Sequence, residues 1–187
     1  MNTNYRIGVG LLIEDEAFNR MRFAQMGVAR ATGVDFGLLQ PPHITVVRPF
    51  EVEEIEDIYH VVRTIESASK EFYAKDIDFS ALEAFGNSTL YFKPDEISFL
   101  NHMHLYIKRQ IFRDVTLKDS STVDGRELIF HSTIAYKLND LQFKKGQIWL
   151  GSQEGLVPIH AHLRKIGLFL QVNGQWIVIH TVILRES

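Results

Sequence analysis

The C-terminal part of the chain contains two strand-like runs separated by Asn173-Gly174, and this feature constrains the fold more than any other. Residues 163–172 and 175–184 are both rich in β-branched and aromatic residues, which favour strands. Asn-Gly between two such runs is the strongest short signal for a two-residue hairpin, because both turn residues need a positive φ. The chain therefore ends in a pair of antiparallel strands.

Strand-like and helix-like patterns alternate along the rest of the chain. In order, the spacing of apolar residues predicts a strand at 7–13, a helix at about 15–31, a strand at 43–47, a helix at about 55–65, a hairpin at about 78–92, a helix at about 97–111 and a strand at 128–135. With the closing hairpin, this order predicts an α+β fold with antiparallel sheets. No linker rich in Gly, Ser or Pro divides the sequence, so we expect residues 1–187 to form a single domain.

The composition excludes several kinds of site. The 187 residues include no cysteine, which excludes disulfides, thiolate-ligated zinc, iron–sulfur clusters and a cysteine nucleophile. The net charge of −3 argues against long nucleic acids, which need a basic surface, but allows a short or terminal nucleotide. The early apolar run 7–13 is too short to span a membrane and no cleavage site follows it, so we expect a cytoplasmic protein that binds no membrane.

Two short motifs contain residues suited to catalysis. Of the eight histidines, only His43 and His131 are followed at the second position by threonine, at Thr45 and Thr133. Both motifs lie in predicted strands, where residues two apart project from the same face about 7 Å apart. Each histidine therefore points the same way as its threonine. The offset of 88 residues between the histidines, and the place of each motif after a helix, indicate a duplicated layout.

Two imidazoles and two hydroxyls around one phosphate group would suit phosphodiester hydrolysis. The reaction needs a base to deprotonate the attacking water and an acid to protonate the departing oxygen, and histidine can do either near neutral pH. The threonine hydroxyls can donate hydrogen bonds to the phosphate oxygens, where charge builds up in the transition state. This chemistry needs no metal. We take His43 as the acid and His131 as the base, and the exchanged roles stay open.

The residues around the motifs resemble the two-histidine phosphoesterases, also called the LigT-like or 2′-5′ RNA ligase-like superfamily, and especially its small bacterial members. The resemblance spans nearly the whole chain. It rests on Pro-His-Ile-Thr-Val at 42–46 with Phe50 soon after, on Phe-His-Ser-Thr-Ile at 130–134, and on the closing hairpin with Leu-Phe-Leu at 168–170 and Asn-Gly-Gln-Trp at 173–176.

The resemblance implies a bilobal, pseudo-duplicated fold of two antiparallel sheets flanked by helices, with both motifs at a central cleft. It implies that His43 and His131 form the acid–base pair and that Thr45 and Thr133 bind phosphate, without a metal or other cofactor. The substrates that it implies are nucleotides or short RNA ends with 2′,3′-cyclic phosphates, or with 2′-5′ or 3′-5′ linkages.

Three further residues are candidates for binding substrate. Arg48 and Lys137 could neutralise phosphate charge, and Tyr136 could stack on a base. Strand alternation places Arg48 opposite His43, so Arg48 reaches the cleft only if the strand bends or ends there. Tyr136-Lys137 stands where members similar to the bacterial RNA ligase carry arginine, so the resemblance does not extend to ligase activity.

Two other functions are compatible with the sequence. A zinc hydrolase could use the His-x-His pairs at 102–104 and 160–162, although positions two apart on a helix lie about 200° around the axis and no His-Glu-x-x-His pattern occurs. A catalytically silent protein of the same fold could bind a nucleotide or phosphate without hydrolysing it. Activity that survives a chelator would remove the first alternative, and turnover would remove the second.

Overall fold

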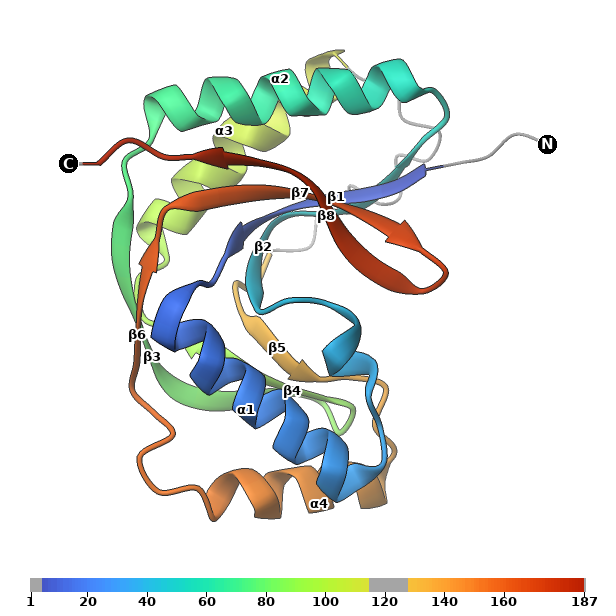
Figure 1. The fold of residues 1–187 in the computed structure, drawn as a ribbon, viewed down its shortest axis with the longest axis vertical. Coiled ribbons are helices and arrows are strands. Elements are labelled where there is room, and N and C mark those ends of the chain that lie inside the picture. Colours follow the sequence, from blue (N-terminus) through green and yellow to red (C-terminus); the bar gives the residue numbers. More distant parts are fainter. Residues whose placement is uncertain (1–4, 115–127, 187) are drawn as a thin grey trace.

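The strands form two antiparallel sheets of four strands each in the computed structural model, which describes residues 5–114 and 128–186 (Figure 1). The upper sheet contains, in spatial order, β2 (His43–Val52), β1 (Tyr5–Leu12), β7 (Lys165–Val172) and β8 (Gln175–Ile183). The lower sheet contains β5 (Ser132–Ala135), β4 (Thr89–Pro94), β3 (Lys75–Phe85) and β6 (Ile159–Leu163). These pairings confirm the predicted α+β fold with antiparallel sheets.

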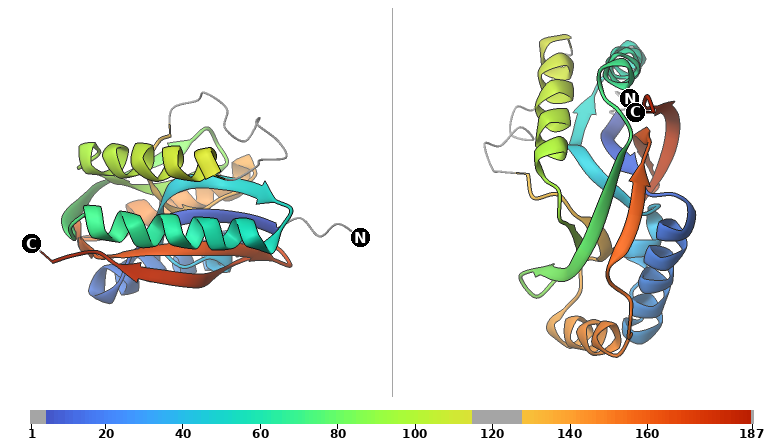
Figure 2. Two further views of the ribbon diagram at one scale, coloured as in Figure 1. Left: turned by 90° about the horizontal axis from the view of Figure 1, so that it is seen from above. Right: turned by 90° about the vertical axis from the view of Figure 1, so that its left-hand side faces the viewer.

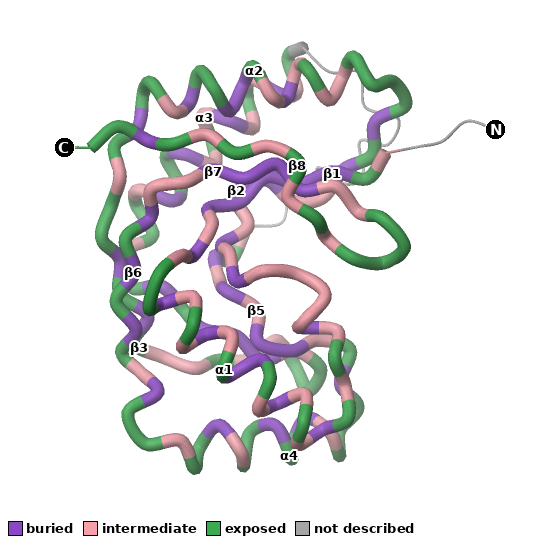
Figure 3. The backbone as a smooth tube through the Cα atoms, viewed as in Figure 1, coloured by how far each residue is buried: buried purple, intermediate pink, exposed green. Residues whose placement is uncertain are grey.

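The helices are divided between the two sheets. The upper sheet packs against α2 (Ile55–Glu71) and α3 (Ser98–Asp114), and the lower sheet packs against α1 (Asp15–Thr32) and α4 (Asp140–Gly151). Figure 2 shows the two resulting lobes from two further sides. One cluster of buried apolar side chains runs through both lobes, and Figure 3 shows buried residues along the central strands β1 and β7. Within the described residues, no helix is long and apolar enough to cross a bilayer.

The sequence patterns predicted most of these elements. The strands, helices and hairpin expected between residues 7 and 111 are present, and the closing hairpin turns through Asn173 and Gly174 with φ values of 50° and 83°. The strand expected at 128–135 is shorter than predicted, because β5 begins only at Ser132. The prediction also omitted α4 and β6.

The two omitted elements have weaker sequence signals than the others. At the start of α4, the Asn139 side chain accepts a hydrogen bond from the Gln142 N–H at 2.9 Å, and the Gln142 side chain accepts one from the Asn139 N–H at 2.9 Å. The interior of α4 contains Gly146, which disfavours a helix, although a Cβ there would lie 2.8 Å from Leu90 Cδ1. In β6, only Ile159, Ala161 and Leu163 face the core, which is a short alternating pattern.

The strands that carry the two motifs, β2 and β5, are each an edge strand of their own sheet. The two edges contact each other where the lobes meet. The short 3₁₀ helix η1 (Phe36–Leu39) packs against β5 at this junction, and a Cβ at Gly37 would overlap the Ile134 carbonyl oxygen. Glycine therefore allows the segment that leads into β2 to lie directly on β5.

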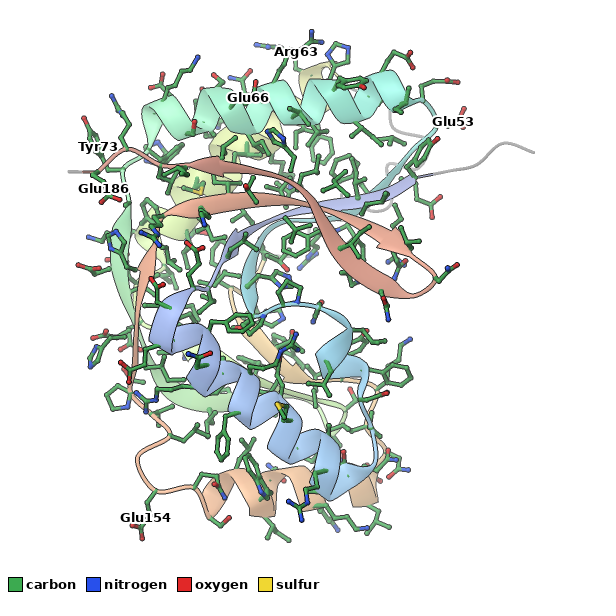
Figure 4. The ribbon with its side chains drawn as sticks, viewed as in Figure 1. Glu53, Arg63, Glu66, Tyr73, Glu154 and Glu186 are labelled. Carbon is green, nitrogen blue, oxygen red and sulfur yellow. The ribbon has the colours of Figure 1, made fainter. Side chains whose placement is uncertain are left out.

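The outer face of the β3–β6 pair carries two histidine–aspartate contacts. His160 Nδ1 lies 2.5 Å from Asp78 Oδ1, and His162 Nδ1 lies 2.7 Å from Asp76 Oδ1. His162 Nε2 also lies 3.3 Å from a carboxylate oxygen of Glu186, a residue near the C-terminal end of the chain (Figure 4). The hydrogen bond to Asp76, supported by that to Glu186, raises the pKa of His162 above its usual value of 6.5.

This pKa shift predicts a pH-dependent contribution of His162 to stability. Because the folded-state pKa is raised, the contribution is complete below the unfolded-state pKa of 6.5 and is lost as the pH rises through the folded-state pKa. The contact is exposed, so we expect at most about 1 kcal/mol. Urea unfolding from pH 5 to pH 9 should show His162→Gln less stable than the unmodified chain at pH 5, with the difference closing at alkaline pH. A difference that stays constant with pH would contradict this cause.

Candidate functional site

The two motif histidines are held by the same hydrogen bond. His43 Nδ1 lies 2.8 Å from the carbonyl oxygen of Pro41, and His131 Nδ1 lies 2.7 Å from the carbonyl oxygen of Ile129. In both cases the acceptor is the carbonyl two residues earlier in the chain. A carbonyl oxygen can only accept, so Nδ1 carries the hydrogen in each ring. Each imidazole therefore keeps Nε2 available for chemistry.

Thr45 lies on β2 with His43, whereas Thr133 lies on β5 and His131 directly precedes that strand. Thr45 Oγ1 lies 3.3 Å from His43 Nε2, so the hydroxyl stands beside the available ring nitrogen. Thr133 is half-buried in β5, and its carbonyl oxygen accepts a hydrogen bond from Gln25 Nε2 at 2.9 Å. The first motif thus brings its imidazole and hydroxyl together as the sequence predicted.

Aromatic rings from neighbouring strands fix both imidazoles. The centroid of the His43 ring lies 4.6 Å from that of Phe169 in β7. The His131 ring lies 4.9 Å from the ring of Phe85 and 5.2 Å from that of Tyr91, which stack on each other at 4.3 Å. Burial and a hydrogen bond to Glu83 raise the pKa of Tyr91 to about 12. The Tyr91 ring beside His131 is therefore uncharged at neutral pH.

Burial lowers the pKa of both motif histidines. For His43 it lowers the pKa to about 4, and the charge of His131 contributes in the same direction. For His131 burial again lowers the pKa, with a contribution from the charge of Arg48. Both rings are therefore neutral near pH 7 in the free protein.

β2 is irregular in the residues just before Arg48. The pairing of β2 with β1 shifts register on both sides of Val47, so two extra residues interrupt the alternation of β2. At the first irregularity, the Val46 carbonyl oxygen accepts a hydrogen bond from His104 Nδ1 at 2.6 Å. Burial lowers the pKa of both His104 and His131, and the charge of Arg48 contributes to each shift. The register of β2 thus changes between His43 and Arg48, so simple alternation from His43 does not decide on which side of the strand Arg48 lies.

Tyr136 and Lys137 form a group with Phe36 of η1. The Tyr136 and Phe36 rings lie 5.7 Å apart, and Lys137 Nζ lies 4.9 Å from the centre of the Phe36 ring. Lys137 has a φ of 59°, the left-handed conformation, directly after β5. These residues lie at the junction of η1 and β5, but they do not line the pocket at His43.

A small open pocket lies on the upper sheet beside His43. It is lined by side chains and backbone from β1, β2, β7, β8 and the segment before β2: Gly8, Val9, Gln40, His43, Thr45, Val47, Pro49, Phe169 and Trp176. Gly10 leaves room for the His43 ring, because a Cβ at this position would lie 2.9 Å from His43 Cδ2. The His43 imidazole and the Thr45 hydroxyl are the polar groups of the first motif in this pocket.

The histidines considered as zinc ligands have other partners. His104 on α3 is bonded to β2, and His160 and His162 are each bonded to an aspartate on β3. The His102 ring packs edge-on against Phe72 at 5.2 Å. In residues 5–114 and 128–186, no group of three or more His, Cys, Asp or Glu is arranged to hold a metal ion.

Comparison with known families agrees with the paired motifs. The sequence model of the 2′-5′ RNA ligase superfamily matches residues 14–175, which include both His-x-Thr segments. The chain belongs to this superfamily of two-histidine phosphoesterases. A curated relative from Bacillus licheniformis, named as a phosphoesterase, is 29% identical over 150 residues, which cover 78% of this chain and 82% of that protein.

Solved structures of similar fold extend over nearly the whole chain of this 2′-5′ RNA ligase superfamily member. The protein TT0787 of Thermus thermophilus has a TM-score of 0.65 at 13% identity, covering 97% of this chain and 99% of that chain. LigT of Escherichia coli in apo form has a TM-score of 0.61 at 9% identity, covering 98% and 99%. LigT in complex with 3′-AMP has a TM-score of 0.63 at 10% identity, covering 97% and 99%. These likenesses confirm the expected bilobal LigT-like fold.

Several residues that support the site were not identified from the superfamily motifs. Gln25 lies on the buried face of α1 and is 2% exposed, and its side chain bonds both Thr133 and Arg22. A glutamine four residues after Met21 on the apolar stripe was a usable signal, because buried polar side chains need partners. Gly10 and Phe169, which fit the His43 ring, gave no comparable signal, since their role depends on strand register.

The close approach at Gly10 generates a prediction about His43. Gly10→Ala should displace the ring from its buried position, because the new Cβ would also lie 2.9 Å from the Ile44 carbonyl oxygen and 3.2 Å from Phe169. The pKa of His43, followed by NMR titration, should then rise from about 4 toward 6.5.

Gly8→Ala is the matched control for this variant, on the same strand. A Cβ at Gly8 meets only ordinary contacts, the nearest at 3.6 Å, so the His43 titration should keep its low midpoint. His43→Gln identifies the His43 signals. A His43 titration that is identical in Gly10→Ala and the unmodified chain would show that this glycine does not set the position of the ring.

Proposed function

We propose that the chain is a phosphodiesterase that opens 2′,3′-cyclic phosphates of nucleotides or RNA ends with two histidines and without a metal. The observation that carries the proposal is the repeated hydrogen bond from each histidine Nδ1 to the carbonyl two residues earlier. It leaves one Nε2 from each sheet edge for proton transfer. Membership in a superfamily of two-histidine phosphoesterases supports the reaction class.

The proposed reaction uses one imidazole as a base and the other as an acid. The base takes a proton from water while the water oxygen forms a bond to phosphorus, and the bond from phosphorus to one ribose oxygen breaks. The acid gives its proton to that ribose oxygen, so the product is a phosphate monoester beside a free hydroxyl. Hydroxyl donors from Thr45 and Thr133 and the positive charge of Arg48 would stabilise the developing negative charge on phosphate.

The pKa of His43 favours one assignment of roles. An imidazole with a pKa of about 4 is neutral over most of the working range, which suits a base. We therefore assign His43 as the base and His131 as the acid, which exchanges the roles first taken from the sequence. The anionic phosphate would favour the protonated form of His131, since an opposite charge nearby raises the pKa of an imidazole.

The fold likeness to LigT supports a nucleotide as the ligand. LigT structures are known in complex with 3′-AMP, with ATP and with phosphate, and each covers this chain almost completely. A 3′-monophosphate is one of the two products that opening a 2′,3′-cyclic phosphate can give. The pocket beside His43 and Thr45 places a ring nitrogen and a hydroxyl where the phosphate of such a ligand would bind.

Turnover of the four 2′,3′-cyclic nucleotides by the purified protein in excess EDTA tests the proposal. We expect product with the unmodified chain and a loss of about 10²- to 10⁴-fold in kcat for His43→Ala and for His131→Ala. His60→Ala on α2 is a matched control, because His60 contacts Arg63 on the same helix and should not affect turnover. Nucleotide binding without turnover would instead favour a catalytically silent protein of the same fold. Activity that EDTA abolishes and an added metal restores would favour a zinc hydrolase.

The lowered histidine pKa values predict the shape of the pH profile. One imidazole must be neutral while the other is protonated, so kcat/KM should follow a bell-shaped curve. Both pKa values lie below 6.5 in the free protein, which puts the maximum below pH 6.5. Initial rates at low substrate concentration from pH 3.5 to pH 9 measure this curve. A rate that rises steadily from pH 5 to pH 9 would contradict the two-histidine mechanism.

A further inference from the structure

The pocket beside His43 extends across the upper sheet to Trp176 in β8. Between them, β1 contributes Gly8, which pairs with Phe169 of β7 and has no side chain to fill the space above the sheet. The backbone of β1 itself therefore forms the pocket floor at Gly8. A flat group attached to a phosphate at His43 and Thr45 could lie over this floor and reach Trp176.

Trp176 differs from the other aromatic residue of the pocket in its available surface. Phe169 is 3% exposed and packs against the His43 ring, so its ring is not accessible to a ligand. Trp176 is only partly buried and lies at the start of β8, beside the Asn173-Gly174 turn. An accessible indole ring within the pocket offers a surface for a planar aromatic group.

Polar groups surround Trp176. The Arg6 guanidinium lies 5.9 Å from the centre of the Trp176 ring, and Arg6 Nη1 lies 3.4 Å from Oε1 of Gln171. Gln171 is the register partner of Trp176 across the hairpin, and Gln40 lines the same pocket from the segment before β2. A cation and two amides beside an indole suit a planar ligand whose edge carries hydrogen-bonding groups, rather than a purely apolar one.

We propose that Trp176 is the stacking surface for the base of a nucleotide whose phosphate is bound at His43 and Thr45, an inference that rests on the proposed function. Arg6 and Gln171 hold the side of the base that faces the hairpin. The substrate class that the pocket selects is thus a nucleotide with an intact base, and a bare sugar phosphate lacks the group that Trp176 binds.

Tryptophan fluorescence tests this binding without turnover. The chain has two tryptophans, so Trp149→Phe leaves Trp176 as the only one, and Trp149 lies on α4 in the lower lobe. Titration of this variant with adenosine 3′-monophosphate should quench the emission in a saturable way. Ribose 3-phosphate and inorganic phosphate, at the same occupancy measured by calorimetry, should not. Equal quenching by all three ligands, or none by the nucleotide, would overturn the proposal.

Kinetics separate this inference from the proposed function. Trp176→Ala should raise KM for 2′,3′-cyclic AMP by about 5- to 150-fold, the range for loss of one base–aromatic stack, with little change in kcat. Trp176→Tyr, which retains an aromatic ring, should restore most of the affinity. With ribose 2,3-cyclic phosphate, which has no base, Trp176→Ala and the unmodified chain should give equal rates.

The outcomes of the two experiments are distinguishable. Turnover of 2′,3′-cyclic AMP with the same KM in Trp176→Ala would overturn the role of Trp176 and leave the proposed function standing. Nucleotide-specific quenching in a protein that turns over no cyclic phosphate would support the stacking site and remove the proposed hydrolysis. Loss of the Trp176→Ala effect when the base is absent from the substrate is the result that only a base-stacking role explains.

Discussion

The two motifs lie on sheet edges, and side chains from helices complete the hydrogen bonding of those edges in place of a fifth strand. On β5, Gln25 of α1 donates to the Thr133 carbonyl oxygen at 2.9 Å, and on β2, His104 of α3 donates to the Val46 carbonyl oxygen at 2.6 Å. A buried carbonyl without a partner would cost about 1–3 kcal/mol. A fifth strand would have satisfied these groups but would also have filled the junction between the lobes. Side-chain donors satisfy them without a further strand.

One helix holds both motifs through a short polar chain. Arg22 Nη1 lies 2.9 Å from Gln25 Oε1, and it also lies within hydrogen-bond distance of the carbonyl oxygens of Leu38 and Gln40, at 3.4 Å and 3.3 Å. These carbonyls belong to the segment that leads into His43, while Gln25 is bonded to β5 at Thr133. The two motifs come from different sheets, so their relative position depends on this connection through α1 as well as on the direct contact of the two strands.

The sequence was sufficient to find the motifs, but not the geometry that surrounds them. His-x-Thr on a strand depends only on local alternation, and the Asn173-Gly174 hairpin depends only on turn chemistry, so both could be predicted. The position of Arg48 could not, because the irregularities in β2 arise from pairing with β1, which lies more than thirty residues away in the chain. The same holds for Gly10 and Phe169, whose contacts with His43 exist only once three strands are in register.

The carbonyl partners of the histidines also affect how a proton would be supplied. A histidine bonded to a carboxylate has a nearby negative charge that favours its protonated form, whereas Pro41 and Ile129 offer neutral carbonyl oxygens. Burial then lowers the pKa of both rings, and a charge on His131 further opposes protonation of His43. In the proposed reaction, the phosphate of the substrate is the anion that offsets this cost. The acid would form when the substrate binds, so substrate binding and proton uptake would be coupled at the same two imidazoles.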